Sequence, residues 1–104
     1  MAIHLVYITT RDSNEAKSIG HHLVASRLAA CVNIIEGMIS IYRWNGELQE
    51  DQEAVLIAKT TENRVTALIE AVKERHSYEC PCIVSFPVTR GNEAYLNWIA
   101  GQVS

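Results

Sequence analysis

The order of hydrophobic and polar positions along the chain predicts a β-α-β-β-α-β arrangement followed by a short helix. Residues 3–10, IHLVYITT, are apolar on both alternating sets and rich in β-branched and aromatic side chains, which is typical of a strand buried on both faces. Residues 31–35 begin a second strand. Glu36-Gly37 interrupts it as a bulge or bend, and residues 38–44 resume it.

Asn45-Gly46 lies between two strand-like runs and predicts a hairpin with a type I′ turn. The return arm covers residues 47–60 and is polar first and apolar afterwards. Each arm reaches about 45 Å at roughly 3.3 Å per residue, whereas a domain of this size is only about 30–35 Å across. The hairpin tip therefore projects, and we expect other copies of the chain to cover its apolar side chains in an obligate homo-oligomer. These side chains are Ile39, Ile41, Tyr42 and Trp44.

Helical periodicity follows the first strand. Asp12 with Glu15 three residues later marks a helix start, and Ser13 is the alternative cap. The core-facing stripe of this helix is formed by Ala16, Ile19, Leu23, Val24 and Leu28.

Two further helices and one strand complete the chain. Thr60 or Thr61 caps the second helix, and Val65, Leu68, Ile69 and Val72 form its inner face. Residues 82–88 form the last strand, which Pro87 marks as an edge strand or a strand end. The third helix starts at Asn92, and its expected inward side chains are Tyr95, Trp98 and Ile99.

The order of elements predicts an α+β, ferredoxin-like βαββαβ sandwich, with helices on one face of a four-stranded antiparallel sheet. Right-handed crossovers place the first and third strands in the centre. At 104 residues, the chain is expected to form one domain over residues 1–104.

Composition and charge argue against several classes of function and partner. The net charge of −3 and the pI near 5.7 argue against a nucleic-acid or anionic-membrane partner. No stretch approaches the roughly 20 apolar residues of a membrane span, and the N-terminus does not resemble a signal peptide, so we expect a cytoplasmic protein. In that compartment the three cysteines are free thiols or ligands rather than a disulfide framework.

The segment HSYECPCIVSFPV, residues 76–88, carries the most conspicuous candidate chemistry. Cys80 and Cys82 are separated only by Pro81, which fits neither the usual zinc spacing nor a redox Cys-X-X-Cys motif. One interpretation is two small apolar residues at a strand entrance. The other is a metal or redox site, with His76 as the nearby third group.

Enzyme motifs are absent from the sequence. It contains no Gly-x-Gly-x-x-Gly, P-loop or His-Glu-x-x-His pattern. An RNA-recognition module shares this strand order but needs aromatic motifs on its central strands and basic surroundings, which this chain lacks. We therefore expect a protein that is not an enzyme.

Five blocks of the sequence, in the same order and spacing, resemble the CutA family of divalent-cation tolerance proteins. They are RLAACVNI (27–34), IYRWNGELQE (41–50), EAVLIAKTT (53–61), HSYECP (76–81) and NEAYLNWI (92–99). The resemblance covers essentially the whole chain. It implies a ferredoxin-like fold in a tight homotrimer built around the extended hairpin. It also implies similarity to the PII signalling proteins, trimers that bind small ligands in clefts between subunits.

The resemblance also implies which residues line such clefts. They are Trp44, Glu53, Lys59, Tyr78, Glu79 and Trp98. Lys59 ends an apolar strand, where an unpaired charge is costly, so it needs either a ligand or a salt bridge to a carboxylate such as Glu79.

The family name refers to tolerance of copper and other divalent metals. The family commonly has His-Pro-Tyr-Glu where this chain has His76-Ser77-Tyr78-Glu79. We hypothesise that any metal contact, to copper or another divalent cation, uses His76 with Cys82 or Cys80. The alternative hypothesis is a PII-like regulator that binds a small anionic ligand or a partner protein in the intersubunit clefts. A third hypothesis, that the protein is a thiol enzyme, requires a reactive cysteine.

Overall fold

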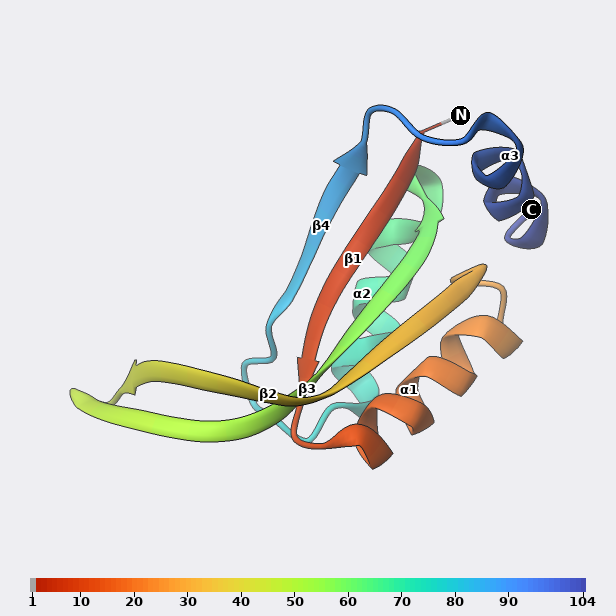
Figure 1. Cartoon of the computed structure of the whole chain (residues 1–104). Helices are drawn as coiled ribbons and strands as arrows, with labels where there is room; N and C mark the ends of the chain where they lie inside the picture. Colours follow the sequence, from red (N-terminus) through yellow and green to blue (C-terminus); the bar gives the residue numbers. More distant parts are fainter. Residues whose placement is uncertain (1) are drawn as a thin grey trace.

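The computed structural model describes residues 2–104 as a four-stranded antiparallel sheet with three helices (Figure 1). The elements in chain order are β1 (Ile3–Thr10), α1 (Ser13–Ala25), β2 (Cys31–Trp44), β3 (Glu47–Thr61), α2 (Glu62–Arg75), β4 (Ile83–Val88) and α3 (Glu93–Gln102). The strand order β2-β3-β1-β4 places β1 and β3 in the centre. The predicted ferredoxin-like α+β fold is therefore confirmed.

The hydrophobic core lies between one face of the sheet and the helices α1 and α2. Val6 and Ile8 of β1 point to this face, because alternate residues of a strand share a side. They are fully buried with Leu23 of α1, Leu56 of β3 and Leu68 of α2. Burial of each such side chain stabilises the fold by about 1.5–3 kcal/mol relative to exposure.

The helix starts follow the predicted capping residues. Asp12 caps α1, and its carboxylate accepts the backbone N–H of Glu15 at 2.8 Å, so the alternative cap Ser13 is the first residue of the helix instead. Thr61 occupies the cap position of α2 without a side-chain bond to the helix, and Asn92 caps α3. Within residues 2–104, no helix is both long and apolar enough to cross a membrane.

The β2–β3 hairpin contains both predicted irregularities. The register shifts between Ile35 and Met38, and Gly37 has a φ of +71°, so the bulge is confirmed. Asn45 and Gly46 have φ angles of +51° and +80°, the left-handed values that a type I′ turn requires.

The hairpin tip projects beyond the core, as its length predicts. The two arms have 14 and 15 residues, and the molecule measures 45 × 25 × 22 Å. Figure 1 shows the tip standing clear of the helices. The large apolar side chains along it are 40–71% exposed, from Tyr42 at the lower limit to Leu48 at the upper.

The second face of the sheet is covered only at one end, by α3. Ile99 of α3 is buried against Ile3, whose side chain points away from the main core. Tyr95 and Trp98 were also expected to point inward, and this expectation is wrong: they are 39% and 44% exposed. One short helix cannot cover both the sheet end and its own aromatic side chains.

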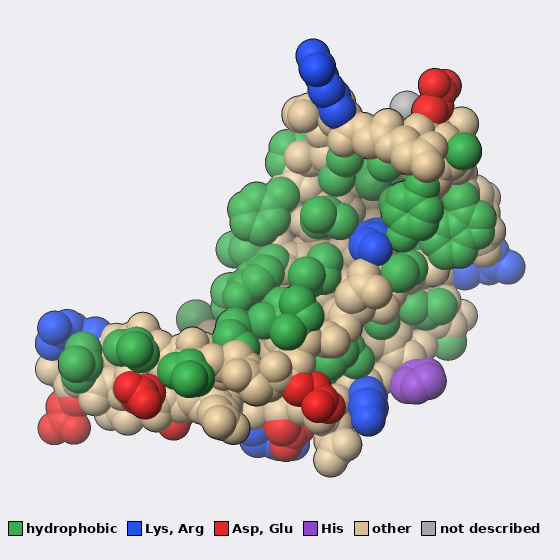
Figure 2. Space-filling view, viewed as in Figure 1, with side chains coloured by type: hydrophobic (Ala, Val, Ile, Leu, Met, Phe, Trp, Pro, Cys, Tyr) green, Lys and Arg blue, Asp and Glu red, His purple; other side chains and the backbone are tan. Residues whose placement is uncertain are grey.

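The rest of this second face is apolar and open. Figure 2 shows hydrophobic side chains gathered over the side of the sheet that faces the viewer. Val84 and Phe86 of the edge strand β4 belong to this surface and are both exposed. Exposed apolar side chains on the open face and along the hairpin tip are typical of surfaces that another molecule covers.

Candidate functional site

The segment between α2 and β4, residues 76–82, meets the base of the β2–β3 hairpin and borders an open hollow of about 340 Å³, which extends from Glu53 at the base to Trp44 near the tip. This hairpin-base hollow is lined by Thr9, Tyr42, Trp44, Glu53, Tyr78, Glu79, Cys80 and Cys82. It brings together four of the six predicted cleft residues and both predicted metal-binding thiols. Their nearness is a structural finding, and their role in binding stays a prediction.

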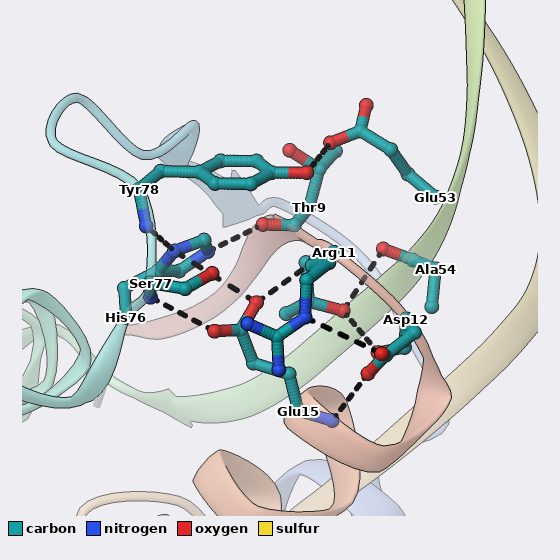
Figure 3. A network of polar contacts seen from close by, with 10 residues as sticks. Thr9, Arg11, Asp12, Glu15, Glu53, Ala54, His76, Ser77 and Tyr78 are labelled. Carbon is teal, nitrogen blue, oxygen red and sulfur yellow. Dashed lines mark hydrogen bonds and ion pairs between the residues drawn. The ribbon is translucent and has the colours of Figure 1, made fainter.

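A phenol–carboxylate hydrogen bond closes one side of the hollow. The Tyr78 hydroxyl donates to Glu53 Oε2 at 2.7 Å, which ties the 76–82 segment to β3 (Figure 3). Burial, followed by this bond and the Glu53 charge, raises the pKa of Tyr78 above its ordinary value of 10.0. Tyr78 is therefore a neutral hydrogen-bond donor at physiological pH.

His76 lies behind the hollow rather than on its surface. The side chain is completely buried, with Nε2 2.7 Å from the Thr9 carbonyl oxygen, and the Tyr78 N–H donates to Nδ1 at 3.0 Å. Nδ1 must therefore carry a lone pair and Nε2 the proton, so the imidazole is neutral. Because both ring nitrogens are occupied, the predicted metal role of His76 requires one of these bonds to break.

Glu15 is a site residue that sequence reasoning missed. Its Oε1 accepts the Arg11 N–H and its Oε2 accepts the Ser77 N–H, both at 2.8 Å, and its side chain is only 6% exposed (Figure 3). Burial alone acts to raise the pKa of Glu15, but the hydrogen bonds from Ser77 and Arg11 outweigh it and lower the pKa below the ordinary value. The buried group is therefore a carboxylate.

Lys59 and Trp98, the two remaining predicted cleft residues, lie at the opposite end of the sheet. Lys59 Nζ donates to the Tyr95 hydroxyl at 3.1 Å and lies 5.3 Å from the centre of that ring. Tyr95 stacks on Trp98 with ring centres 5.7 Å apart. The predicted salt bridge from Lys59 to a carboxylate such as Glu79 does not form within residues 2–104, because Glu79 lies at the hollow and Lys59 contacts Tyr95 at the other end of the sheet.

The thiols are free and accessible at the hollow. Cys80 and Cys82 are exposed, whereas Cys31 is half-buried on β2. The Cys82 carbonyl accepts the Thr9 N–H at 3.3 Å, but β4 begins one residue later than predicted, at Ile83. Nowhere in the described part of the chain do three His, Cys, Asp or Glu side chains converge to hold one metal ion.

The fold and the hollow define a class of protein: a small ferredoxin-like sandwich with a projecting β2–β3 hairpin and an aromatic and acidic hollow at the base of that hairpin. The family model described as CutA1 divalent ion tolerance protein matches residues 4–102. The chain belongs to this family. The resemblance inferred from the sequence blocks is therefore confirmed.

Individual relatives agree with this assignment. The divalent-cation tolerance protein CutA of Thermus thermophilus is 48% identical over 95 residues, which cover 91% of this chain and 92% of the relative. The CutA homolog of Xenopus laevis is 42% identical over 102 residues, covering 98% of this chain and 68% of the relative.

Solved structures extend the agreement to the fold. The Thermus thermophilus structure superimposes with a TM-score of 0.95 at 45% identity and covers 98% of this chain and 99% of that one. CutA1 from Oryza sativa superimposes with a TM-score of 0.97 at 36% identity, covering 100% of this chain and 95% of that one. The projecting hairpin is therefore part of an arrangement shared with these proteins.

Proposed function

We propose that this protein acts in the tolerance of divalent cations, above all copper, as a non-enzymatic homotrimer that contacts the metal at the hairpin-base hollow. The observation that carries the proposal is that Cys80 and Cys82 are exposed on the same hollow as Glu53 and Glu79. Soft thiolates select Cu(I) over the harder divalent ions. Membership of the divalent ion tolerance family also supports a role in the tolerance of divalent cations.

A trimer would cover the exposed apolar surfaces of each chain and bring further side chains to the hollow. The open sheet face and the hairpin tip are apolar and exposed, and association removes such surfaces from water. In the proposed trimer the hairpin of one chain lies beside the hollow of the next and completes the ligand set. The thiols, rather than His76, make the metal contact, because the imidazole already holds Thr9 and Tyr78.

Cu(I) titration under reducing conditions tests this function. The wild-type protein is compared with the Cys80→Ser/Cys82→Ser double variant and with Cys31→Ser, which removes a thiol far from the hollow and serves as the matched control. We expect the double variant to lose tight binding and the control to keep it. Equal affinity of wild type and double variant refutes the site. If the double variant keeps its affinity and His76→Asn loses it, the metal contact depends on His76 instead.

The second candidate function is a PII-like regulator that binds a small anionic ligand between subunits. The observation in its favour is the Lys59 ammonium, which within residues 2–104 contacts the hydroxyl and ring of Tyr95 and no carboxylate, beside the aromatic surface of Trp98. Titration with inorganic phosphate and with a nucleoside triphosphate tests it. Binding that is lost in Lys59→Met but kept in Lys73→Met, a substitution on the outer surface of α2, supports the regulator. Equal binding by the two variants excludes Lys59 from the site.

A further inference from the structure

The 76–82 segment has no regular secondary structure, yet it carries half of the hollow. Tyr78, Glu79, Cys80 and Cys82 all come from it. A segment without ladder hydrogen bonds keeps one conformation only when other groups take its backbone N–H groups. Those groups decide how the hollow presents its thiols and carboxylates.

Two buried side chains take the first backbone N–H groups of this segment. Glu15 Oε2 accepts the N–H of Ser77, and Nδ1 of His76 accepts the N–H of Tyr78. Each is anchored in turn to the end of β1: Glu15 through the Arg11 N–H, and His76 through the Thr9 carbonyl. Figure 3 shows the two side chains packed together between β1 and the segment.

Both anchors need the chemistry that these residues have. The two N–H groups that converge on Glu15 come from different segments of the chain, and each needs an acceptor oxygen. A carboxylate offers two acceptors, whereas an amide offers one acceptor and one donor. His76 must accept at Nδ1 and donate at Nε2, which only the neutral imidazole does.

We propose that Glu15 and His76 form a buried clamp that positions residues 77–80 against the end of β1 and thereby sets the geometry in which the hairpin-base hollow presents Tyr78, Glu79 and Cys80. The role of the clamp in metal presentation rests on the proposed function, whereas its hydrogen bonds do not depend on that function. Glu15 and His76 are positioning residues: they reach the hollow only through the backbone of the segment they hold.

Glu15→Gln is a nearly isosteric test of the clamp, with Glu70→Gln as the matched control. Glu70 is an exposed carboxylate on α2 whose recorded partner is Lys73 at 3.7 Å, so the control makes the same chemical change away from the segment. In Glu15→Gln we expect hydrogen exchange of residues 76–82 to rise about tenfold or more, the effect of losing one hydrogen bond to a charged acceptor. Thiol labelling of Cys80 should accelerate relative to Cys31 in the same molecule.

Cu(I) supplies a spectroscopic measurement that global stability does not change. At saturating metal and in conditions where both variants are fully folded, we expect the Cu(I)–thiolate absorption band of Glu15→Gln to differ from the wild-type band, and that of Glu70→Gln to match it. If wild type shows no such band, the proposed function fails, while exchange and labelling still decide the clamp. Exchange and labelling rates in Glu15→Gln equal to those in Glu70→Gln overturn the clamp.

A second variant covers the case in which Glu15→Gln does not fold. His76→Gln can keep a side-chain N–H for the Thr9 carbonyl, but it has no acceptor atom at the position of Nδ1, so the N–H of Tyr78 loses its partner. We expect faster exchange at Tyr78 and unchanged exchange at Ser77, which Glu15 still holds. Unchanged exchange at both residues overturns the clamp.

Discussion

Tyr78 donates a hydrogen bond of 2.7 Å to Glu53, and this bond joins a segment without regular structure to the base of the projecting hairpin. A second phenol–carboxylate bond, from Tyr42 to Asp51, lies further along the same hairpin. The Tyr78–Glu53 bond therefore attaches the hairpin to the body of the protein in addition to the sheet, and the Tyr42–Asp51 bond joins the two arms of the hairpin. The hollow depends on this attachment, because Glu53 and Tyr78 both line it.

The Tyr78–Glu53 bond predicts a loss of stability in alkaline solution. The raised pKa of Tyr78 means that the folded state holds the phenol proton more tightly than the unfolded state. The stabilising contribution is complete below the ordinary pKa of 10.0 and is lost as the pH rises above it. In Tyr78→Phe, the free energy of unfolding should be lower at neutral pH and should fall less steeply above pH 10.0.

Urea denaturation at a series of pH values measures this difference. Tyr7→Phe is the matched control, because within residues 2–104 the Tyr7 hydroxyl donates only to the Met38 thioether at 3.5 Å, a weak acceptor. We expect the control to keep the steep alkaline loss of the wild type. If the Tyr78→Phe profile is parallel to the wild-type profile across this range, the bond does not link stability to the phenol proton.

Gly20 lies where α1 packs closely against the sheet, and this contact predicts the effect of adding a Cβ there. A Cβ at this position would lie 2.9 Å from Cγ2 of Val32, whose β-branched side chain has little freedom to move away. The overpacking penalty of about 1–3 kcal/mol exceeds the gain of about 1 kcal/mol from replacing a helical glycine. Gly20→Ala should therefore reduce the free energy of unfolding by up to about 2 kcal/mol.

Gly101→Ala is the control for Gly20→Ala. Gly101 is also helical, but a Cβ there meets nothing within 4 Å, so only the helix-propensity term remains. We expect Gly101→Ala to leave the stability unchanged or to raise it by up to about 1 kcal/mol. Urea denaturation of both variants measures the difference, and equal effects would show that α1 and β2 can separate at little cost.

Local patterns in the sequence predicted the elements that depend on local chemistry. Asn45-Gly46 specified its turn because few other residues adopt two consecutive positive φ angles. Asp12 capped α1 because a short carboxylate reaches the N–H three residues on. The strand order followed from the handedness of the crossovers.

The contacts that build the site were beyond these patterns. Glu15 and Ser77 are 62 positions apart, and nothing in either neighbourhood indicates that one carboxylate serves both the end of β1 and the distant segment. The partner of Lys59 was also missed, because Tyr95 was assigned to the inner face of its helix. Periodicity shows which residues share a face, but it does not show which surface, if any, covers that face.

The exposed hairpin predicts an oligomer held together by the apolar tip, and the family resemblance implies that this oligomer is a trimer. Ile41 of β2 is 65% exposed, and a lysine there places a charge in the surface that another chain should cover. Val24→Lys is the matched control, because Val24 is also an exposed aliphatic residue, contrary to its expected place in the core-facing stripe, but lies on α1 beside the start of β2 and away from the hairpin tip. Light scattering at micromolar concentration should give three times the chain mass of 11.6 kDa for wild type and Val24→Lys. Ile41→Lys should shift toward the mass of one chain, since each covered aliphatic side chain contributes about 1.5–3 kcal/mol and the symmetric trimer loses three. A wild-type protein with the mass of one chain would contradict both the trimer and the proposed sharing of the hollow between subunits.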